Sequence, residues 1–198
     1  MIDAAVAAIR AGRLAIVPTD TVYGLVTGPY SEAPARRLYR AKGREGLQPT
    51  ALVAADLELL FECVPELRGR SGTVARALLP GPYTLVLPNP ARRYRWLTGA
   101  NPDAIGVRVP ALDGPGREVL ERAGAYVATS ANLPGGADPA TLDAVPAELR
   151  VAAEAVVDGG PLAGIPSTVL DLTGAEPLVL REGAAPAAEA LRLVAPLL

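Results

Sequence analysis

The sequence of 198 residues contains no histidine, one cysteine and one lysine. The absence of histidine removes the commonest general base at neutral pH and the commonest metal ligand. The lone Cys63 excludes a disulfide within the chain and a cysteine-based zinc site, and its neighbours Phe61 and Val64 predict a buried thiol at a helix end rather than a nucleophile. Catalysis by this chain would therefore rest on hydroxyl, amide, carboxylate and cationic groups, which suit phosphoryl or nucleotidyl transfer.

Aromatic residues are also scarce, at 4% of a chain that is 50% hydrophobic, so the core must consist mainly of Ala, Val, Leu and Ile. The 20 glycines and 20 prolines are spread without a period, which argues against a collagen-like or low-complexity chain. No apolar run is long enough to cross a bilayer, no signal-peptide pattern is present, and a net charge of −2 offers no general attraction for nucleic acid. We expect one domain over residues 1–198, a cytoplasmic location and no membrane partner.

Short apolar runs alternate with amphipathic segments along the chain, which predicts an α/β fold. Strands are expected near residues 14–17, 50–54, 83–87, 105–109, 125–128, 155–157, 168–172 and 178–181. Helices are expected near residues 3–11, 31–41, 56–62, 72–79, 116–123, 141–149 and 186–195, with a polar turn over residues 18–24. The cluster of late strands favours a mixed sheet over a purely parallel one.

Polar residues follow several of the expected segments, where the loops of an α/β sheet tend to converge on ligands. They are Thr19, Asp20 and Thr21; Lys42 and Arg44; Ser130 and Asn132; Ser167 and Thr168; and Arg181. Residues i and i+2 of an extended segment point to the same side, so Lys42 and Arg44 could direct two cations at one anion. By the same spacing, Ser130 and Asn132 could direct a hydroxyl and an amide at one region.

Each of these pieces also has a purely structural interpretation. Hydroxyl residues after strands are commonly turn formers or caps, and Asp20 could be a cap. Lys42 and Arg44 could form the solvated end of a helix, where cations are expected, and Lys42 could be a lysine left at a surface position by chance. However, an ammonium on a flexible stem is not equivalent to a guanidinium, and 18 of the 19 basic residues are arginine. Arg181 could pair with Glu182 or Glu176.

One basic and aromatic segment, residues 92–96 (RRYRW), suits phosphate contacts and base stacking. The alternative, which we favour, is a loop in which Trp96 packs inward while Arg92, Arg93 and Arg95 face water. The chain has no Walker A loop and no glycine-rich dinucleotide fingerprint, so a standard P-loop or dinucleotide-binding fold is unsupported.

Eight short motifs together resemble those of the YrdC/TsaC family. In the family's order, they lie at residues 17–25 (VPTDTVYGL), 42–44 (KGR), 79–86 (LPGPYTLV), 96–99 (WLTG), 107–110 (VRVP), 129–133 (TSANL), 167–169 (STV) and 180–183 (LREG). The combination of Lys-x-Arg with Ser-x-Asn is the specific part. The resemblance implies a single-domain twisted, mixed β-sheet flanked by helices, with a large concave, positively lined cavity. The chain resembles the family's short form, so we expect no added C-terminal domain.

The resemblance also implies threonylcarbamoyl-AMP synthase activity. In that reaction L-threonine, bicarbonate and ATP give threonylcarbamoyl-adenylate and pyrophosphate, and the product serves the threonylcarbamoyladenosine modification of tRNA. The implied cofactor is Mg²⁺, bound through the substrate phosphates rather than by protein ligands. The implied partners are downstream tRNA threonylcarbamoyl-transferase proteins, and residues 92–96 offer a weak tRNA contact.

The family's functional residues can be carried over to matching positions of this chain. Lys42 and Arg44 resemble catalytic residues that hold phosphates and the carbamate, and Asn132 and Arg181 resemble further nucleotide contacts. Thr19, Arg108, Ser130 and Ser167 resemble threonine-binding positions, and either Arg108 or Arg44 would suit the amino-acid carboxylate. This assignment agrees with the composition, because a carboxylate that attacks an α-phosphate brings negative groups together and cations then supply most of the stabilisation.

Three residues depart from the family pattern. Glu45 stands where a proline is usual, Leu112 where a histidine often follows the Arg-x-Pro motif, and Val53 where some members have histidine. These differences bear on how threonine is positioned. Two other functions stay open from the sequence: carbamoyl transfer, as in related domains of longer hydrogenase-maturation proteins whose metal-binding segments this chain lacks, and RNA binding by a paralogue without synthase activity.

Overall fold

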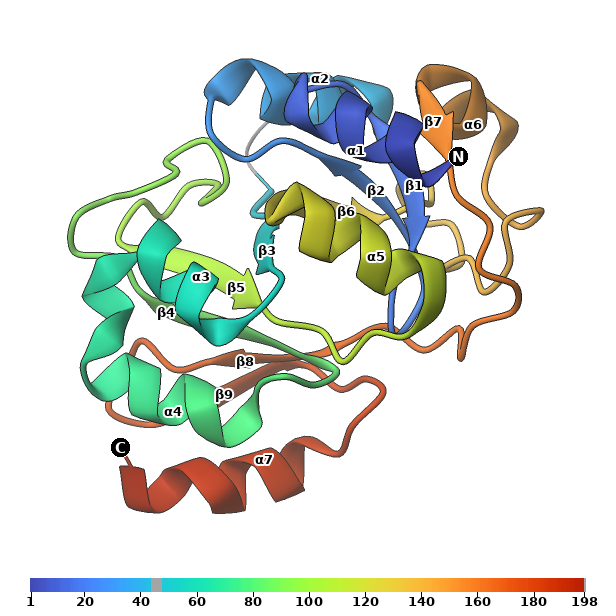
Figure 1. Cartoon of the computed structure of the whole chain (residues 1–198). Coiled ribbons are helices and arrows are strands. Elements are labelled where there is room, and N and C mark those ends of the chain that lie inside the picture. Colours follow the sequence, from blue (N-terminus) through green and yellow to red (C-terminus); the bar gives the residue numbers. More distant parts are fainter. Residues whose placement is uncertain (44–47, 198) are drawn as a thin grey trace.

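The computed structural model describes residues 1–43 and 48–197 and has the expected α/β architecture (Figure 1). The strands are β1 (Ala15–Pro18), β2 (Tyr23–Thr27), β3 (Ala51–Ala54), β4 (Tyr83–Pro88), β5 (Ala104–Arg108), β6 (Ala125–Ser130), β7 (Ala155–Val156), β8 (Thr168–Asp171) and β9 (Leu178–Arg181). The helices are α1 (Ile2–Arg10), α2 (Glu32–Ala41), α3 (Leu57–Cys63), α4 (Arg70–Leu78), α5 (Gly114–Ala123), α6 (Ala147–Ala152) and α7 (Ala187–Val194), with 3₁₀ turns at Pro65–Arg68 and Ala195–Leu197.

The described strands form one nine-stranded sheet in the order β7-β1-β2-β6-β3-β5-β4-β8-β9. Three pairs are parallel, namely β1 with β7, β3 with β5 and β4 with β8, and the other pairs are antiparallel. The expected mixed sheet is therefore confirmed. Strands that are distant in sequence lie next to each other in it, so that β6 is inserted between β2 and β3.

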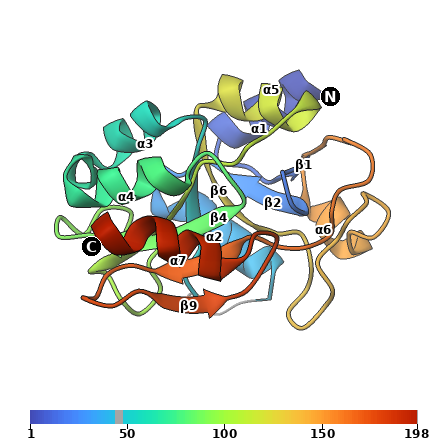
Figure 2. The same cartoon turned by 90° about the horizontal axis from the view of Figure 1, so that it is seen from below.

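Alternate residues of the strands face two different apolar layers. Val17, Val26, Val53 and Tyr126 pack with α1 and α5, whereas the residues next to them in the chain belong to the apolar cluster that includes α2, α3 and α4. Helices α1 and α5 lie side by side over one end of the sheet in Figure 1, and Figure 2 shows α7 on the opposite side of the molecule from them. The core is thus divided by the sheet.

Small residues continue the α1/α5 face of the sheet beyond these two helices. Ala128 on β6 lies opposite Ala51 on β3, which lies opposite Gly106 on β5. Side chains of this size leave space above the sheet, where larger ones would fill it. The same strand face therefore carries a packed apolar core at one end and the floor of a cavity at the other.

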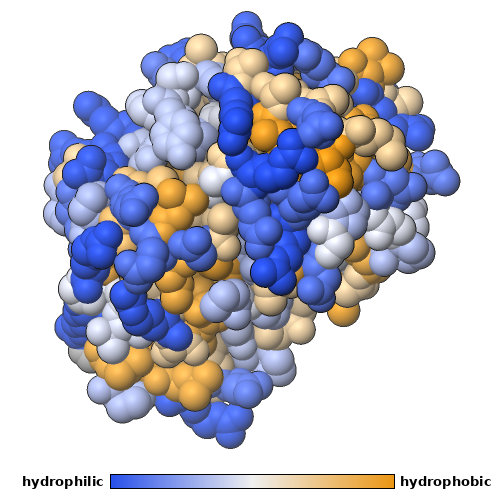
Figure 3. Space-filling view, viewed as in Figure 1, coloured by the Kyte–Doolittle hydropathy of each residue, from blue (hydrophilic) through white to orange (hydrophobic). Residues whose placement is uncertain are grey.

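A hydrophilic band crosses the upper part of the face shown in Figure 3, with apolar residues on either side of it. Ion pairs between Arg117 and Glu121 and between Arg122 and Glu118 run along the exposed side of α5. Exposed pairs of this kind contribute little to stability, about 0–1 kcal/mol each, so α5 is held mainly by its apolar contacts with α1 and the sheet. None of the helices described here has the length and apolar character needed to cross a bilayer.

Two expected elements differ from the structure. Residues 18–24 do not form only a turn, because β2 begins at Tyr23, and all of its residues are buried, so the strand lacks the alternating pattern of a half-exposed one. Helix α6 begins at Ala147 rather than near 141, because Pro146 occupies its N-cap and disfavours a helical conformation in the residue before it. Cys63 ends α3 as expected, but its side chain is half-buried rather than buried.

Tyr23 fixes the long connection between β7 and β8, which carries Ser167 at its end. Its hydroxyl donates to Asp158 Oδ1 at 2.8 Å and lies 2.9 Å from Gly160 O, and it accepts from the Gly159 amide at 2.9 Å. We expect Tyr23→Phe to lower the free energy of unfolding by about 1–3 kcal/mol, because the phenyl ring leaves these groups without their buried partner. Chemical denaturation followed by circular dichroism measures the loss.

A matched control is Tyr126→Phe. Tyr126 is also fully buried, but its hydroxyl makes no hydrogen bond of standard geometry within the described part of the chain. Its removal should leave the free energy of unfolding nearly unchanged. Equal losses in both variants would contradict the anchoring role of the Tyr23 hydroxyl.

Candidate active site

A cavity of about 370 Å³ opens above Ala51, Gly106 and Ala128. Its lining is rich in hydroxyl groups, which include those of Thr19, Thr21, Thr84, Thr129, Ser130 and Ser167. Arg108 and Arg181 also line it, and Asp171 is the carboxylate residue among the described lining residues. A concave site with two guanidinium groups and many neutral donors is suited to an anionic, hydroxyl-bearing ligand.

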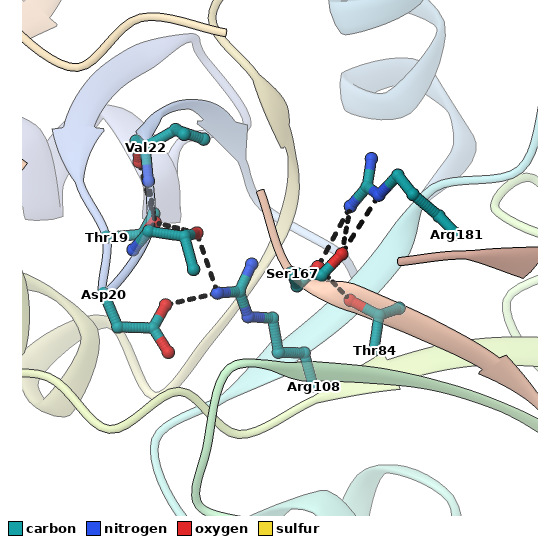
Figure 4. A network of polar contacts seen from close by, with 8 residues as sticks. Thr19, Asp20, Val22, Thr84, Arg108, Ser167 and Arg181 are labelled. Atoms are coloured by element: carbon teal, nitrogen blue, oxygen red, sulfur yellow. Dashed lines mark hydrogen bonds and ion pairs between the residues drawn. The ribbon is translucent and has the colours of Figure 1, made fainter. Parts of the chain in front are cut away.

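Arg108, at the end of β5, is held at one side of the cavity by the turn after β1 (Figure 4). Its Nη2 donates to Asp20 Oδ1 and, at 3.0 Å, to Thr21 Oγ1. The side chains are 12% exposed for Arg108 and 7% for Asp20, so the ion pair is shielded from water. Burial raises the pKa of Asp20, and the opposing effect of Arg108 is smaller.

Ser167 and Arg181 form the opposite side of the cavity (Figure 4). Ser167 Oγ lies 2.8 Å from Thr84 Oγ1, and Arg181 Nη2 donates to Ser167 O at 2.8 Å and to Ser167 Oγ at 3.1 Å. Arg181 thus bonds Ser167 rather than Glu182 or Glu176, the sequence alternatives. Burial lowers the pKa of Arg181, and the charge of Arg108 lowers it further, while Asp138 acts in the opposite sense. Two cations that repel each other across one cavity favour an anion between them.

Lys42 lies at the C-cap of α2 and its side chain is fully buried. Its Nζ donates to Ser130 O at 2.6 Å and to Asn132 Oδ1 at 2.7 Å, and Ser130 Oγ donates to the same Asn132 oxygen at 2.8 Å. Asn132 Nδ2 in turn donates to Gly136 O at 2.7 Å. The structure therefore brings Lys42, Ser130 and Asn132 into one cluster, in which Ser130 reaches the cavity lining. Lys42 is not a solvated surface cation.

Most of the site residues expected from the sequence converge on this region. Thr19, Arg108, Ser130, Ser167 and Arg181 line the cavity, and Lys42 and Asn132 contact Ser130. Arg44, expected to act with Lys42, lies outside the described residues, as does Glu45.

Sequence reasoning missed some of the lining and its support. Thr84 lies within the motif at residues 79–86 but was assigned no role, Thr21 was named only as one of the polar residues after the first strand, and Gly106 carries no motif signal. Asp20 was interpreted only as a polar residue of the turn or a cap, whereas it is the ion-pair partner of Arg108. Val53, one of the departures from the family pattern, lines the cavity, whereas Leu112 packs against the α1/α5 apolar cluster.

The basic loop at residues 92–96 has the inward-packed arrangement favoured from the sequence. Trp96 Nε1 donates to Pro29 O at 3.0 Å, and the ring packs against the core. Arg92 Nε lies 2.7 Å from Asp103 Oδ1, and Arg93 Nε lies 2.7 Å from Glu66 Oε2. Both guanidinium groups are thus engaged by carboxylates, which weakens the case for a nucleic-acid surface here.

Comparisons with known proteins agree with this arrangement. Residues 7–183 match the Sua5/YciO/YrdC family model, which is described as telomere recombination. The chain is 35% identical over 189 residues to a threonylcarbamoyl-AMP synthase of Pyrococcus abyssi, a match that covers 94% of this chain and 55% of that protein. It is 38% identical over 128 residues to a threonylcarbamoyl-AMP synthase of Methylococcus capsulatus, which covers 65% of this chain and 68% of the relative.

Solved structures show the same relationship. A crystal structure of P. abyssi Sua5 complexed with L-threonine matches with a TM-score of 0.88 and 34% identity, over 98% of this chain and 57% of that one. E. coli YciO matches with a TM-score of 0.78 and 27% identity, over 100% of this chain and 92% of that one. The chain thus spans little more than half the length of the P. abyssi relatives. The chain belongs to the Sua5/YciO/YrdC family, as its motifs indicate.

Proposed function

We propose that this chain is a threonylcarbamoyl-AMP synthase, which converts L-threonine, bicarbonate and ATP into threonylcarbamoyl-AMP and pyrophosphate. The observation that carries the proposal is the convergence of Thr19, Arg108, Ser130 and Ser167 on one cavity. The P. abyssi relatives support it, since one is named for this activity and another is complexed with L-threonine.

The threonine end of the proposed site centres on Arg108. A guanidinium group binds a carboxylate through paired, charge-assisted hydrogen bonds, and Arg108 donates to the Thr21 hydroxyl in the β1–β2 turn. Thr19 and Ser167 can orient the amino acid through neutral hydrogen bonds, because both are small hydroxyl residues in the lining. Ser130 completes the threonine-binding set.

The nucleotide end of the proposed site uses Arg181, Asn132, Lys42 and Arg44. Arg181 lines the cavity, and Lys42 places a buried positive charge beside the cavity-lining Ser130. The free amine of threonine first forms a bond to the carbon of CO₂, which bicarbonate supplies by releasing hydroxide. The nitrogen then loses a proton, so that carbamate and water are the products of this step. A carbamate oxygen then attacks the α-phosphorus, and the bond to the β-phosphate breaks to release pyrophosphate. Fixed cations stabilise the charge that gathers in this step, and charges act more strongly where water is excluded.

Mg²⁺ is proposed as the cofactor, held through the phosphates of ATP. The described residues contain no group of three acidic or cysteine side chains that could hold a metal ion, so a protein cage is not supported there. With ATP bound, the ion would neutralise phosphate charge. Downstream tRNA threonylcarbamoyl-transferase proteins are the proposed partners. A cytoplasmic location and a weak tRNA contact through Arg92, Arg93, Arg95 and Trp96 stay predictions.

Pyrophosphate release from ATP tests the proposed function. We expect release to require L-threonine, bicarbonate and Mg²⁺ together, so that omission of any one, or addition of a chelator, reduces it to background. A Gly106→Ala variant, purified in the same way, is the control for the effects of mutation and purification. We expect it to release pyrophosphate like wild type, because its added Cβ meets its nearest neighbour at 3.7 Å, an ordinary contact. Release that is indifferent to threonine would refute the synthase and favour another group transfer.

A further inference from the structure

Three buried polar groups beside the cavity lack a hydrogen bond of standard geometry. They are Asp20 Oδ2, Arg108 Nε and Tyr126 OH. None of the three has a hydrogen-bond partner among residues 1–43 and 48–197. A buried polar group without a partner costs free energy, and three such groups in one place call for an explanation. The Arg108–Asp20 ion pair does not satisfy them, because it uses Arg108 Nη2 and Asp20 Oδ1, and the nearby backbone amides of Asp20 and Ala111, which lower the pKa of Asp20, make no hydrogen bond of standard geometry to Oδ2.

The three residues form one cluster on the cavity face of the sheet. Arg108 on β5 and Tyr126 on β6 both lie directly opposite Val53 on β3, so their side chains leave the same face two strands apart. Adjacent strands are about 4.8 Å apart, which places the two Cα atoms at roughly 10 Å, within reach of two long side chains. Burial raises the pKa of Tyr126, and the charge of Arg108 lowers this pKa while that of Asp20 raises it.

The hydrogen-bonding capacities of the three groups are complementary. Arg108 Nε can only donate, Asp20 Oδ2 can only accept while ionised, and a phenol can do both. One chain of two hydrogen bonds, from Arg108 Nε to Tyr126 OH and from Tyr126 OH to Asp20 Oδ2, would satisfy all three. Neither bond is present in the structure, so formation of the chain requires a shift of both the Arg108 guanidinium and the Asp20 carboxylate.

We propose that Tyr126 and Asp20 are positioning residues for Arg108, and that a carboxylate ligand in the cavity completes this hydrogen-bond chain. The inference rests on the proposed function, in which that ligand is L-threonine. A carboxylate that draws on the other donors of Arg108 selects one guanidinium orientation, and the new bonds to Tyr126 and Asp20 then stabilise it. Tyr126 would thus raise affinity for threonine without touching it.

Calorimetric titration of L-threonine into the whole protein, without ATP, tests this role. We expect Tyr126→Phe to raise the dissociation constant about tenfold, which is the typical value of one buried hydrogen bond. The KM for threonine should rise in parallel, while the rate of pyrophosphate release at saturating threonine stays within about twofold of wild type, because the contact orients Arg108 rather than the reacting atoms.

Thr27→Val is the matched control. Thr27 is also fully buried with a hydroxyl that makes no standard hydrogen bond to the described residues, but it lies opposite Val127, on the other face of the sheet from Tyr126. If the Tyr126 hydroxyl were only a structural imperfection, both variants would bind threonine like wild type and differ only in stability. We expect only Tyr126→Phe to bind more weakly.

Asp20→Asn provides a second, independent variant. Its amide keeps the size of the carboxylate but replaces one oxygen with an NH₂ group that can only donate, so the Oδ1 and Oδ2 positions cannot both accept, one from Arg108 and the other from Tyr126. We expect Asp20→Asn to bind threonine more weakly than wild type. Because both residues belong to one hydrogen-bond chain, their effects should not add: the dissociation constant of the double variant Asp20→Asn/Tyr126→Phe should lie within about twofold of that of the weaker-binding single variant. If wild type binds L-threonine and Tyr126→Phe binds it equally well, the inference is overturned while the proposed function stands. If wild type does not bind L-threonine, both fall.

Discussion

Lys42→Ala is expected to lower the rate of pyrophosphate release by at least about 100-fold, the typical cost of removing one group that stabilises developing charge. Lys42 Nζ holds both Ser130 O and Asn132 Oδ1, and it supplies a positive charge next to the cavity. Alanine removes the charge and also frees the two residues that it orients. Steady-state release with saturating ATP, threonine and bicarbonate measures the loss.

Lys42→Arg tests whether the reaction needs the ammonium group itself or only a positive charge at this position. The lysine side chain is fully buried, and a planar guanidinium is wider and places its donors differently, so we expect strong impairment although the charge is retained. Arg40→Ala, an exposed position on the same helix, is the control for general effects on α2 and should release pyrophosphate at the wild-type rate. Wild-type rates in Lys42→Arg would show that the ammonium itself is dispensable.

Gly106→Leu is expected to abolish detectable L-threonine binding while the protein stays folded. Gly106 lies in the cavity floor on β5, and a leucine side chain there would project into the space that Ala51, Gly106 and Ala128 leave open. The backbone at Gly106 is that of an ordinary strand, so a larger residue adds bulk to the cavity rather than backbone strain. Titration calorimetry reports binding, and thermal unfolding reports the fold.

Gly106→Ala is the matched control for this blockage. A Cβ at this position meets Ala51 Cα and Thr50 O at 3.7 Å, so alanine fits without displacing either. We expect alanine to retain threonine binding and leucine to lose it. Binding in a folded Gly106→Leu variant that equals wild type would show that threonine binds elsewhere, and it would contradict the assignment of this cavity.

Local patterns in the sequence predict most elements of this fold, but they do not predict the strand order. Most expected strands lie within a few residues of the observed ones, because each is a short apolar run between turn residues. The strand β2 was missed because Tyr23–Thr27 is buried on both faces and begins within a polar motif. The position of β6 between β2 and β3 depends on pairing across more than 70 residues of sequence, which no local pattern encodes.

The site was predictable where residue spacing determines it. The i, i+2 spacing of Ser130 and Asn132 predicted that their side chains point to one region, and in the structure the two side chains bond each other. The partner of Arg108 was not predictable, because Asp20 is 88 residues away and meets it only through the sheet. The same holds for Tyr126, whose place beside Arg108 follows from the two strand registers on either side of Val53.

Mass spectrometry of the product provides the decisive measurement of the proposed reaction. The protein would be supplied with L-threonine, ATP, Mg²⁺ and isotopically labelled bicarbonate, and the nucleotides analysed before any transferase is added. We predict an adenylate that contains threonine and the labelled carbon, formed in step with pyrophosphate and lost in Lys42→Ala. An unlabelled adenylate, or pyrophosphate without any threonine-containing adenylate, would contradict the assignment of this cavity as a threonylcarbamoyl-AMP synthase site.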